Sequence, residues 1–287
     1  MSAPAWGRCA DLADAAGDRR EGTAPPADHW LLIEHPGPWE QLALTSPGLE
    51  PAALTTWAAR YGGRVALIRR PGRRRDTGPR RWFRVDSRPG HEGILTGEYR
   101  DTTELATLPF HSGRSWARPL TLVCTHGKHD PCCAVRGRPL AAALAGADPD
   151  GTWECSHLGG CRFAPAVVLL PHGFTFGGVD PAEAAGIVRS YAEGILEPAK
   201  LRGRSSLPPV VQTAHHHARA ATGARGVDDL RLVAAERDGD ERWRVTFDDP
   251  ACTVVLRERF RSLDRPLTCA ARRPGRVQVF DLLEAGP

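Results

Sequence analysis

The sequence predicts a globular α/β protein with more than one region, and three observations support this prediction. First, apolar runs of strand length alternate with segments of helical pattern over residues 30–195. Second, hydrophobic residues make up 41% and charged residues 25% of the 287-residue chain, as is usual for a globular protein. Third, the chain is long enough for one large domain or about two to three small ones, and its pattern changes near residues 115 and 200.

Residues 1–115 are predicted to form an N-terminal α/β region. Strand candidates at 30–34 and 64–69 flank a helix candidate at 51–61, which is a βαβ pattern. A basic stretch at 69–84 then carries eight arginines and is interpreted as a solvated loop, with steering of an acidic partner as an alternative. Because no nucleic-acid-binding motif accompanies these arginines, we expect no nucleic-acid partner.

Residues 116–200 have the most regular pattern. The predicted elements are strand 119–125, loop 126–133, a helix with Pro139 in its first turn, strand 152–157, a hairpin over 166–179 and a helix that starts at Asp180. The order β-α-β-β-β-α is close to the one that a thioredoxin-like domain needs. This region is therefore predicted to be a thioredoxin-like domain.

Residues 201–287 are predicted to be a C-terminal extension made of a helix and strands. A helix candidate at 210–222 precedes three runs of alternating polarity, which indicate antiparallel strands. These runs lie at 243–247, 252–258 and 277–283.

For the N-terminal region, a second thioredoxin-like unit stays open as an interpretation.

The start of the chain has acidic residues and no apolar core of a signal peptide, and no apolar run approaches the roughly 20 residues that span a bilayer. We therefore expect a cytoplasmic protein without a membrane partner. Stable disulfides are rare in that reducing compartment, and clustered cysteines there more often bind metal or carry out redox chemistry.

Five of the eight cysteines are clustered in the central region, at positions 124, 132, 133, 155 and 161, whereas Cys9, Cys252 and Cys269 are isolated in the sequence. Four candidate ligands lie beside predicted strand ends: Cys124, Cys133, His157 and Cys161. Thiolates and an imidazole suit either zinc or an iron–sulfur cluster. The chain contains no CxxC, which argues against a zinc knuckle and against dithiol exchange.

Two motifs carry a family resemblance. The segments CTHGKHDPCCAVRGRPL (124–140) and WECSHLGGCRFAPAVVLLPHG (153–173) resemble the sucrase/ferredoxin-like family, relatives of the thioredoxin-like ferredoxins. The resemblance continues at 29–39 and 201–214, so it covers most of the chain. It implies a [2Fe–2S] cluster held by a Cys-x₈-Cys pair and by a second pair spaced by three residues.

On this chain the implied cluster ligands are Cys124, Cys133, His157 and Cys161. Eukaryotic members have two histidines in the second pair, and this chain departs from them at Cys161. The departure leaves open whether Cys161 is a ligand and whether Cys155 competes with His157. We expect Cys9, Cys252 and Cys269 to be dispensable for the cluster.

The resemblance implies a one-electron carrier with no catalytic residues, more a ferredoxin than an enzyme. Its expected partners are a reductase and an acceptor protein, because no GxGxxG fingerprint for a nucleotide is present. Three thiolates and one imidazole would give the oxidised cluster a formal charge of about −1, so its potential should exceed the roughly −400 mV of plant-type ferredoxins. The second nitrogen of the imidazole should couple this potential to pH.

Four residues beside the ligands are expected to support the site. The glycines Gly159 and Gly160 allow backbone N–H groups to approach the cluster sulfurs, and the cations Arg162 and Lys128 offset its charge.

Several alternatives stay open at this point. His126 or His129 could replace His157, and Cys132 could replace Cys133. The same ligands could hold structural zinc. A thiol peroxidase or reductase could use Cys132, Cys133 or Cys155 as its nucleophile. A sugar-cleaving activity would need a pair of carboxylates, and none is readable.

Overall fold

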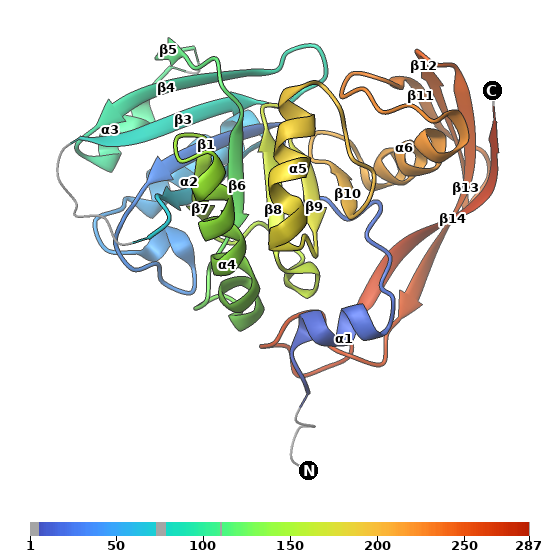
Figure 1. The fold of residues 1–287 in the computed structure, drawn as a ribbon, viewed down its shortest axis with the longest axis horizontal. Coiled ribbons are helices and arrows are strands. Elements are labelled where there is room, and N and C mark those ends of the chain that lie inside the picture. Colours follow the sequence, from blue (N-terminus) through green and yellow to red (C-terminus); the bar gives the residue numbers. More distant parts are fainter. Residues whose placement is uncertain (1–5, 73–78, 110, 287) are drawn as a thin grey trace.

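The computed structural model describes residues 6–72, 79–109 and 111–286. Across these residues, ten strands form one large mixed sheet and four strands form a smaller antiparallel sheet (Figure 1). The predicted α/β fold class is confirmed. Within the same described ranges, no helix is both long and apolar enough to cross a bilayer.

The strands of the large sheet are β1 (His29–Glu34), β2 (Gly63–Arg69), β3 (Arg80–Asp86), β4 (Gly93–Tyr99), β5 (Arg114–Ser115), β6 (Leu120–Cys124), β7 (Thr152–Cys155), β8 (Ala166–Leu170), β9 (Phe174–Gly177) and β10 (Leu201–Arg204). The smaller sheet contains β11 (Arg231–Arg237), β12 (Arg242–Asp248), β13 (Cys252–Ser262) and β14 (Arg276–Gly286). The helices are α1 (Cys9–Ala15), α2 (Pro51–Tyr61), α3 (Thr102–Thr107), α4 (Pro131–Ala147), α5 (Pro181–Ala192) and α6 (Pro209–Thr222), with 3-10 turns η1 (Ala43–Thr45) and η2 (Cys161–Phe163).

The central part of the chain has the predicted thioredoxin-like arrangement. Strand β6 pairs in parallel with β7 and antiparallel with β8, which pairs antiparallel with β9. Helix α4 connects β6 to β7, and α5 follows β9. This is the β-α-β-β-β-α order that the sequence pattern indicates, with the strands in the order β9-β8-β6-β7.

The N-terminal region repeats this topology. Strand β1 pairs in parallel with β2 and antiparallel with β3, which pairs antiparallel with β4. Helix α2 connects β1 to β2, and α3 follows β4. The two thioredoxin-like units meet edge to edge, because β2 pairs antiparallel with β7. Strands β5 and β10 extend the two outer edges of the combined sheet.

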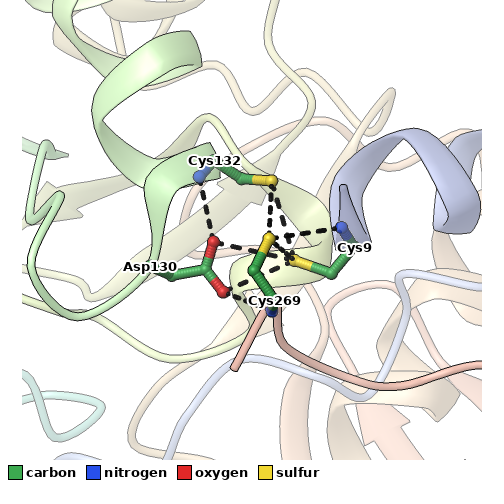
Figure 2. A group of neighbouring side chains, drawn as sticks. All are labelled: Cys9, Asp130, Cys132 and Cys269. Atoms are coloured by element: carbon green, nitrogen blue, oxygen red, sulfur yellow. Dashed lines mark hydrogen bonds between the residues drawn. The ribbon is translucent and has the colours of Figure 1, made fainter. Parts of the chain in front are cut away.

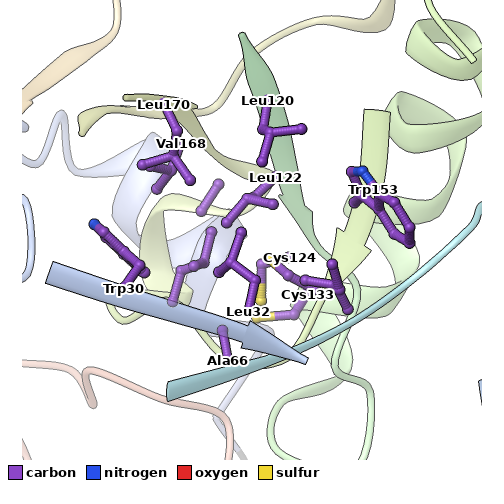
Figure 3. Close-up of a cluster of buried hydrophobic side chains, with 14 of the residues drawn as sticks. Trp30, Leu32, Ala66, Leu120, Leu122, Cys124, Cys133, Trp153, Val168 and Leu170 are labelled. Atoms are coloured by element: carbon purple, nitrogen blue, oxygen red, sulfur yellow. The ribbon is translucent and has the colours of Figure 1, made fainter. Parts of the chain in front are cut away.

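The two faces of the large sheet are covered differently. One face packs against α2, α3, α4 and α5, through core clusters that include Leu31, Leu54, Val123 and Leu140. The opposite face carries a core cluster that includes Trp30, Leu32 and Leu122. Cys124 and Cys133 belong to the same cluster and lie beside each other (Figure 3). The candidate ligands therefore belong to a buried region of the molecule.

Helix α4 begins earlier than the sequence pattern predicts. The Asp130 carboxylate accepts a hydrogen bond from the N–H of Cys132 at 2.9 Å, and Pro131 occupies the first turn. This start corrects two expectations: Cys132 and Cys133 belong to the helix, not to a loop, and Pro139 lies in the helix interior. Asp130 and Pro131 form the same Asp-Pro pair that predicts the helix start at residue 180, so this pair is the sequence signal for the start of α4.

The basic stretch 69–84 is only partly a loop. Strand β3 begins at Arg80, which corrects the expectation for residues 80–84, and residues 73–78 lie outside the described residues. The Arg69 guanidinium lies 4.2 Å from the Trp39 ring, and that of Arg70 lies 3.6 Å from the Trp153 ring. These two arginines therefore cover aromatic side chains. Strand β11 was not predicted, since its exposed face has little apolar periodicity.

Candidate metal centre

The first pair of candidate ligands comes from the end of β6 and the start of α4. Cys124 is the last residue of β6, and Cys133 lies in the first turn of α4. The helix can approach the strand because Gly137 has no side chain: a Cβ there would lie 2.1 Å from the carbonyl oxygen of Cys124. Helix α4 therefore positions Cys133 beside Cys124.

The second pair comes from the loop after β7. His157 follows the strand, and Cys161 opens the turn η2. Gly159 and Gly160 have φ values of +97° and +72°, which favour glycine. A Cβ at Gly159 would lie 2.5 Å from Pro25, and one at Gly160 would lie 2.4 Å from Arg202. Both glycines are therefore required by the turn and by close neighbours.

The four side chains gather in one place. The ligand atoms of Cys124, Cys133 and His157 all lie within 4.8 Å of one another. A second such set contains His129, His157 and Cys161, with Cys161 Sγ at 3.5 Å from His157 Nδ1. Among the described residues these are two sets that share His157, so the candidate ligands extend over more space than one compact tetrahedron.

Ionisation of the site follows from these contacts. The Cys133 thiol donates to Cys124 and, with His157, lowers the pKa of Cys124 against the effect of burial. Burial lowers the pKa of His157, but the sulfurs of Cys124 and Cys161 outweigh it and raise this pKa to about 9. The pKa of Cys161 falls to about 7, because Cys133 and His157 interact with its thiolate. The pocket thus favours the thiolates of Cys124 and Cys161, the form that binds metal. The hydrogen bonds of Cys133 to these two sulfurs, together with burial, raise the pKa of Cys133, which is the donor of the group.

His126 is a poor substitute for His157. Its Nδ1 accepts a hydrogen bond from the N–H of His157 at 3.3 Å, which leaves Nε2 to donate to the carbonyl oxygen of Glu40 at 2.8 Å. Both ring nitrogens are therefore engaged. His129 is closer to the ligands, since its ring stacks on that of His157 with the centroids 3.6 Å apart.

The two other cysteines of the motif lie outside both sets of ligand atoms that contain His157. Cys155 lies opposite Cys124 in the β6–β7 pairing and is fully buried, and it belongs to neither set of ligand atoms in the described structure. Cys132 contacts Cys9 and Cys269, on the other side of the α4 start from Cys133.

Three arginines, of which Arg202 is buried and the other two are partly buried, lie around the ligands. Arg64 donates to the carbonyl oxygen of His157 at 2.8 Å, and Arg202 donates to that of Gly159 at 3.0 Å. Arg162 interacts electrostatically with Cys161 and lies 3.5 Å from Asp18. Burial lowers the pKa of all three groups, that of Arg202 to about 9.

Of the two cations expected from the sequence, Arg162 lies in this group, whereas Lys128 forms an exposed ion pair with Glu40 at 2.8 Å. Arg64 and Arg202 were not singled out. Arg202 belongs to the segment 201–214 that carries part of the family resemblance, and this was the available signal. Nothing comparable marks Arg64, because only the pairing of β2 with β7 brings it to the site.

A family model described as sucrase/ferredoxin-like matches residues 21–203. No curated protein matches the chain. A solved structure of a variant of the thioredoxin-like [2Fe-2S] ferredoxin from Aquifex aeolicus is 25% identical, covers 27% of this chain and 89% of that chain, and has a TM-score of 0.23. Because the family model spans more than half of the residues, this chain belongs to the sucrase/ferredoxin-like family.

Proposed function

We propose that this protein is a one-electron carrier with a [2Fe–2S] cluster bound by Cys124, Cys133, His157 and Cys161. The observation that carries the proposal is the convergence of three cysteine sulfurs and one imidazole from the junction of β6 with α4 and from the segment after β7. Family membership supports it, since the ligand motifs lie inside the matched residues.

The donor set fits such a cluster better than a single zinc ion. A tetrahedral zinc site with thiolate ligands needs each pair of donor sulfurs about 3.8 Å apart. In the described residues, Cys124 and Cys133 form one set of neighbouring ligand atoms with His157, and Cys161 belongs to another set, with His157 and His129. Four donors that extend beyond one tetrahedron would suit two irons with two protein ligands each, and thiolates with imidazole are known cluster ligands.

The surrounding residues would control the redox chemistry that a bound cluster supplies. The sulfurs of Cys124, Cys133 and Cys161 belong to residues that are at most 2% exposed, so water is excluded from them. The guanidinium groups of Arg64 and Arg202 place positive charge nearby, which favours the reduced, more negative state.

His157 is the most exposed of the four side chains, so we infer that electrons enter and leave at its edge. The proposed partners are a reductase and an acceptor protein that dock on this side of the molecule.

Thiol chemistry is the weaker interpretation. Burial raises the pKa of Cys132 to about 11 and also raises that of Cys155. Both residues are fully buried as well. A thiol nucleophile has to be ionised and accessible, and neither residue meets these requirements.

The test compares cysteine variants of the full chain after anaerobic purification. We expect wild-type protein to contain two irons and two acid-labile sulfides per chain, with a paramagnetic signal on reduction. Cys124→Ser should lose them, whereas Cys252→Ser should keep them, because Cys252 lies in the core of the smaller sheet. Full iron content in Cys124→Ser, or zinc in place of iron in the wild type, contradicts the proposal.

A further inference from the structure

A second group of cysteines lies beside the proposed cluster site. Cys9 in α1, Cys132 in α4 and Cys269 in the loop between β13 and β14 meet around the carboxylate of Asp130 (Figure 2). Cys9 and Cys269 are isolated in the sequence, and each lies more than 100 residues from Cys132 along the chain. Only the folded structure brings the three sulfurs together.

The three sulfurs form a nearly regular triangle. Cys9 Sγ lies 3.7 Å from Cys132 Sγ and 3.6 Å from Cys269 Sγ, and the third side, between Cys132 and Cys269, measures 3.4 Å. The Asp130 carboxylate adds a fourth donor, with its oxygens 3.5 and 3.8 Å from Cys9 Sγ. All four ligand groups lie within 4.8 Å of one another.

These distances match the edges of a tetrahedron around zinc. A Zn–S bond of about 2.3 Å gives a sulfur–sulfur edge of about 3.8 Å. With a Zn–O bond of about 2.0 Å, the sulfur–oxygen edge is about 3.5 Å. The group is thus more compact than the two overlapping sets at the cluster site, and it has the size of a mononuclear centre.

We propose that Cys9, Cys132, Cys269 and Asp130 form a structural zinc site. The donor set of three thiolates and one carboxylate suits this ion. Four protein ligands leave no open position, which is typical of structural and not catalytic zinc. The site is separate from the proposed cluster, since the adjacent residues Cys132 and Cys133 turn to different sites.

Backbone groups already orient the donors. The N–H of Cys9 donates to Cys269 Sγ at 3.4 Å, and the N–H of Ala10 donates to the sulfur of Cys132. The Asp130 oxygens each accept one backbone N–H at 2.9 Å, from Cys132 and from Cys269. A carboxylate oxygen keeps a second lone pair, so this arrangement fixes Asp130 and still lets it bind a metal.

Zinc at this position would join three distant segments. It would attach α1 and the loop 263–275 to the first turn of α4, which also carries Cys133 of the proposed cluster site. Figure 1 shows α1 next to that C-terminal loop, which connects the lower ends of β13 and β14. The metal would therefore hold the N-terminal segment and the C-terminal extension against the thioredoxin-like core.

The first experiment measures metals in the full-length protein. The chain is produced with zinc and iron in the medium, purified anaerobically under reducing conditions, and freed of any affinity tag. We expect one zinc per chain, and X-ray absorption at the zinc edge should show three sulfurs at about 2.3 Å and one lighter ligand at about 2.0 Å. Absence of zinc, or a shell of nitrogen and oxygen alone, would overturn the proposal.

Matched variants separate this site from the proposed cluster. Cys9→Ser and Cys269→Ser should lose zinc and keep iron, whereas Cys133→Ser should lose iron and keep zinc. Cys252→Ser is the control and should keep both metals. Retention of one zinc with an unchanged sulfur shell in Cys9→Ser would contradict the assignment. A disulfide between Cys9 and Cys269 in wild-type protein that is purified anaerobically and contains no zinc would also contradict it. If the variants do not fold, the absorption spectrum of the wild type still decides.

Discussion

At the residue scale, the positive charges next to the proposed ligands come mainly from arginines that are distant from these ligands in the sequence. Arg202 is the most buried of the three arginines, and its guanidinium reaches the loop between His157 and Cys161 through the carbonyl oxygen of Gly159. It also donates to Thr23 Oγ1 at 3.1 Å. A positive charge in a buried position interacts strongly with added negative charge, so this residue should tune reduction of the site.

We predict that Arg202→Met lowers the reduction potential by tens of millivolts, on the order of what one charge exerts in a protein interior. Arg202→Lys should recover much of the shift, because the charge is kept. The control is Arg219→Met, since Arg219 is also buried but bonds to the carbonyl oxygens of Ala224 and Gly226. Protein-film voltammetry measures all three variants, and equal potentials for Arg202→Met and wild type would exclude this role.

His157 should make the potential depend on pH. Loss of a proton from its second ring nitrogen adds negative charge, so the potential should fall as pH rises through the alkaline range. The slope should be at most about 59 mV per pH unit for one electron. A His157→Cys variant should show a lower potential and no such slope. A flat voltammetric response of the wild type from neutral to strongly alkaline pH would rule out this coupling.

At the scale of elements, helix α4 brings the first ligand pair together and also separates the two cysteine sites. Its N-cap, Asp130, fixes where the helix begins, and the first turn then presents Cys132 and Cys133 in different directions. The depth at which the helix packs depends on Gly137, whose missing side chain leaves room for the carbonyl group of Cys124.

We predict that Gly137→Ala displaces α4 from β6 and reduces iron content, with a loss of about 1–3 kcal/mol in unfolding free energy from overpacking. Gly146→Ala is the matched control in the same helix, because a Cβ there meets no atom within 4 Å. It should leave iron unchanged and stabilise the helix by up to about 1 kcal/mol. Iron analysis and urea unfolding distinguish the two, and full iron in Gly137→Ala would contradict the prediction.

At the scale of the whole molecule, the two thioredoxin-like units divide their roles. All four proposed ligands belong to the central unit, while the N-terminal unit supplies contacts around them. Arg64 in β2 bonds to His157, and the segment after β1 bonds to His126 through Glu40. The pairing of β2 with β7 therefore links the stability of one unit to the geometry of the site in the other.

We predict that Ser156→Ala weakens this junction. Ser156 Oγ accepts a hydrogen bond from the N–H of Leu67 at 3.0 Å, and both residues are buried. Its loss leaves a buried donor unsatisfied and should lower the unfolding free energy by about 1–3 kcal/mol and shorten the lifetime of the bound cluster. Ser112→Ala, at an exposed turn, should change stability by less than about 0.5 kcal/mol. Identical urea midpoints for both variants would refute the prediction.

Much of the architecture could be predicted because its signals are local. The apolar runs of β1, β2, β6 and β8 are bounded by turn residues, and Asp180 with Pro181 marks a helix start. The start of α4 at Pro131 was missed because the histidine- and cysteine-rich segment before it resembles a loop. The antiparallel pairing of β2 with β7 could not be predicted from the sequence either, because it forms only between the edges of two folded units.

The sequence alone determined the family, the thioredoxin-like order of elements and the four candidate ligands, because each is written in short contiguous motifs. Only the tertiary structure decided that Arg64 and Arg202 lie against those ligands and that Cys9 and Cys269 meet Cys132. These contacts join residues that are distant along the chain. Strand pairing and loop docking bring these residues into contact, and no local sequence pattern encodes either.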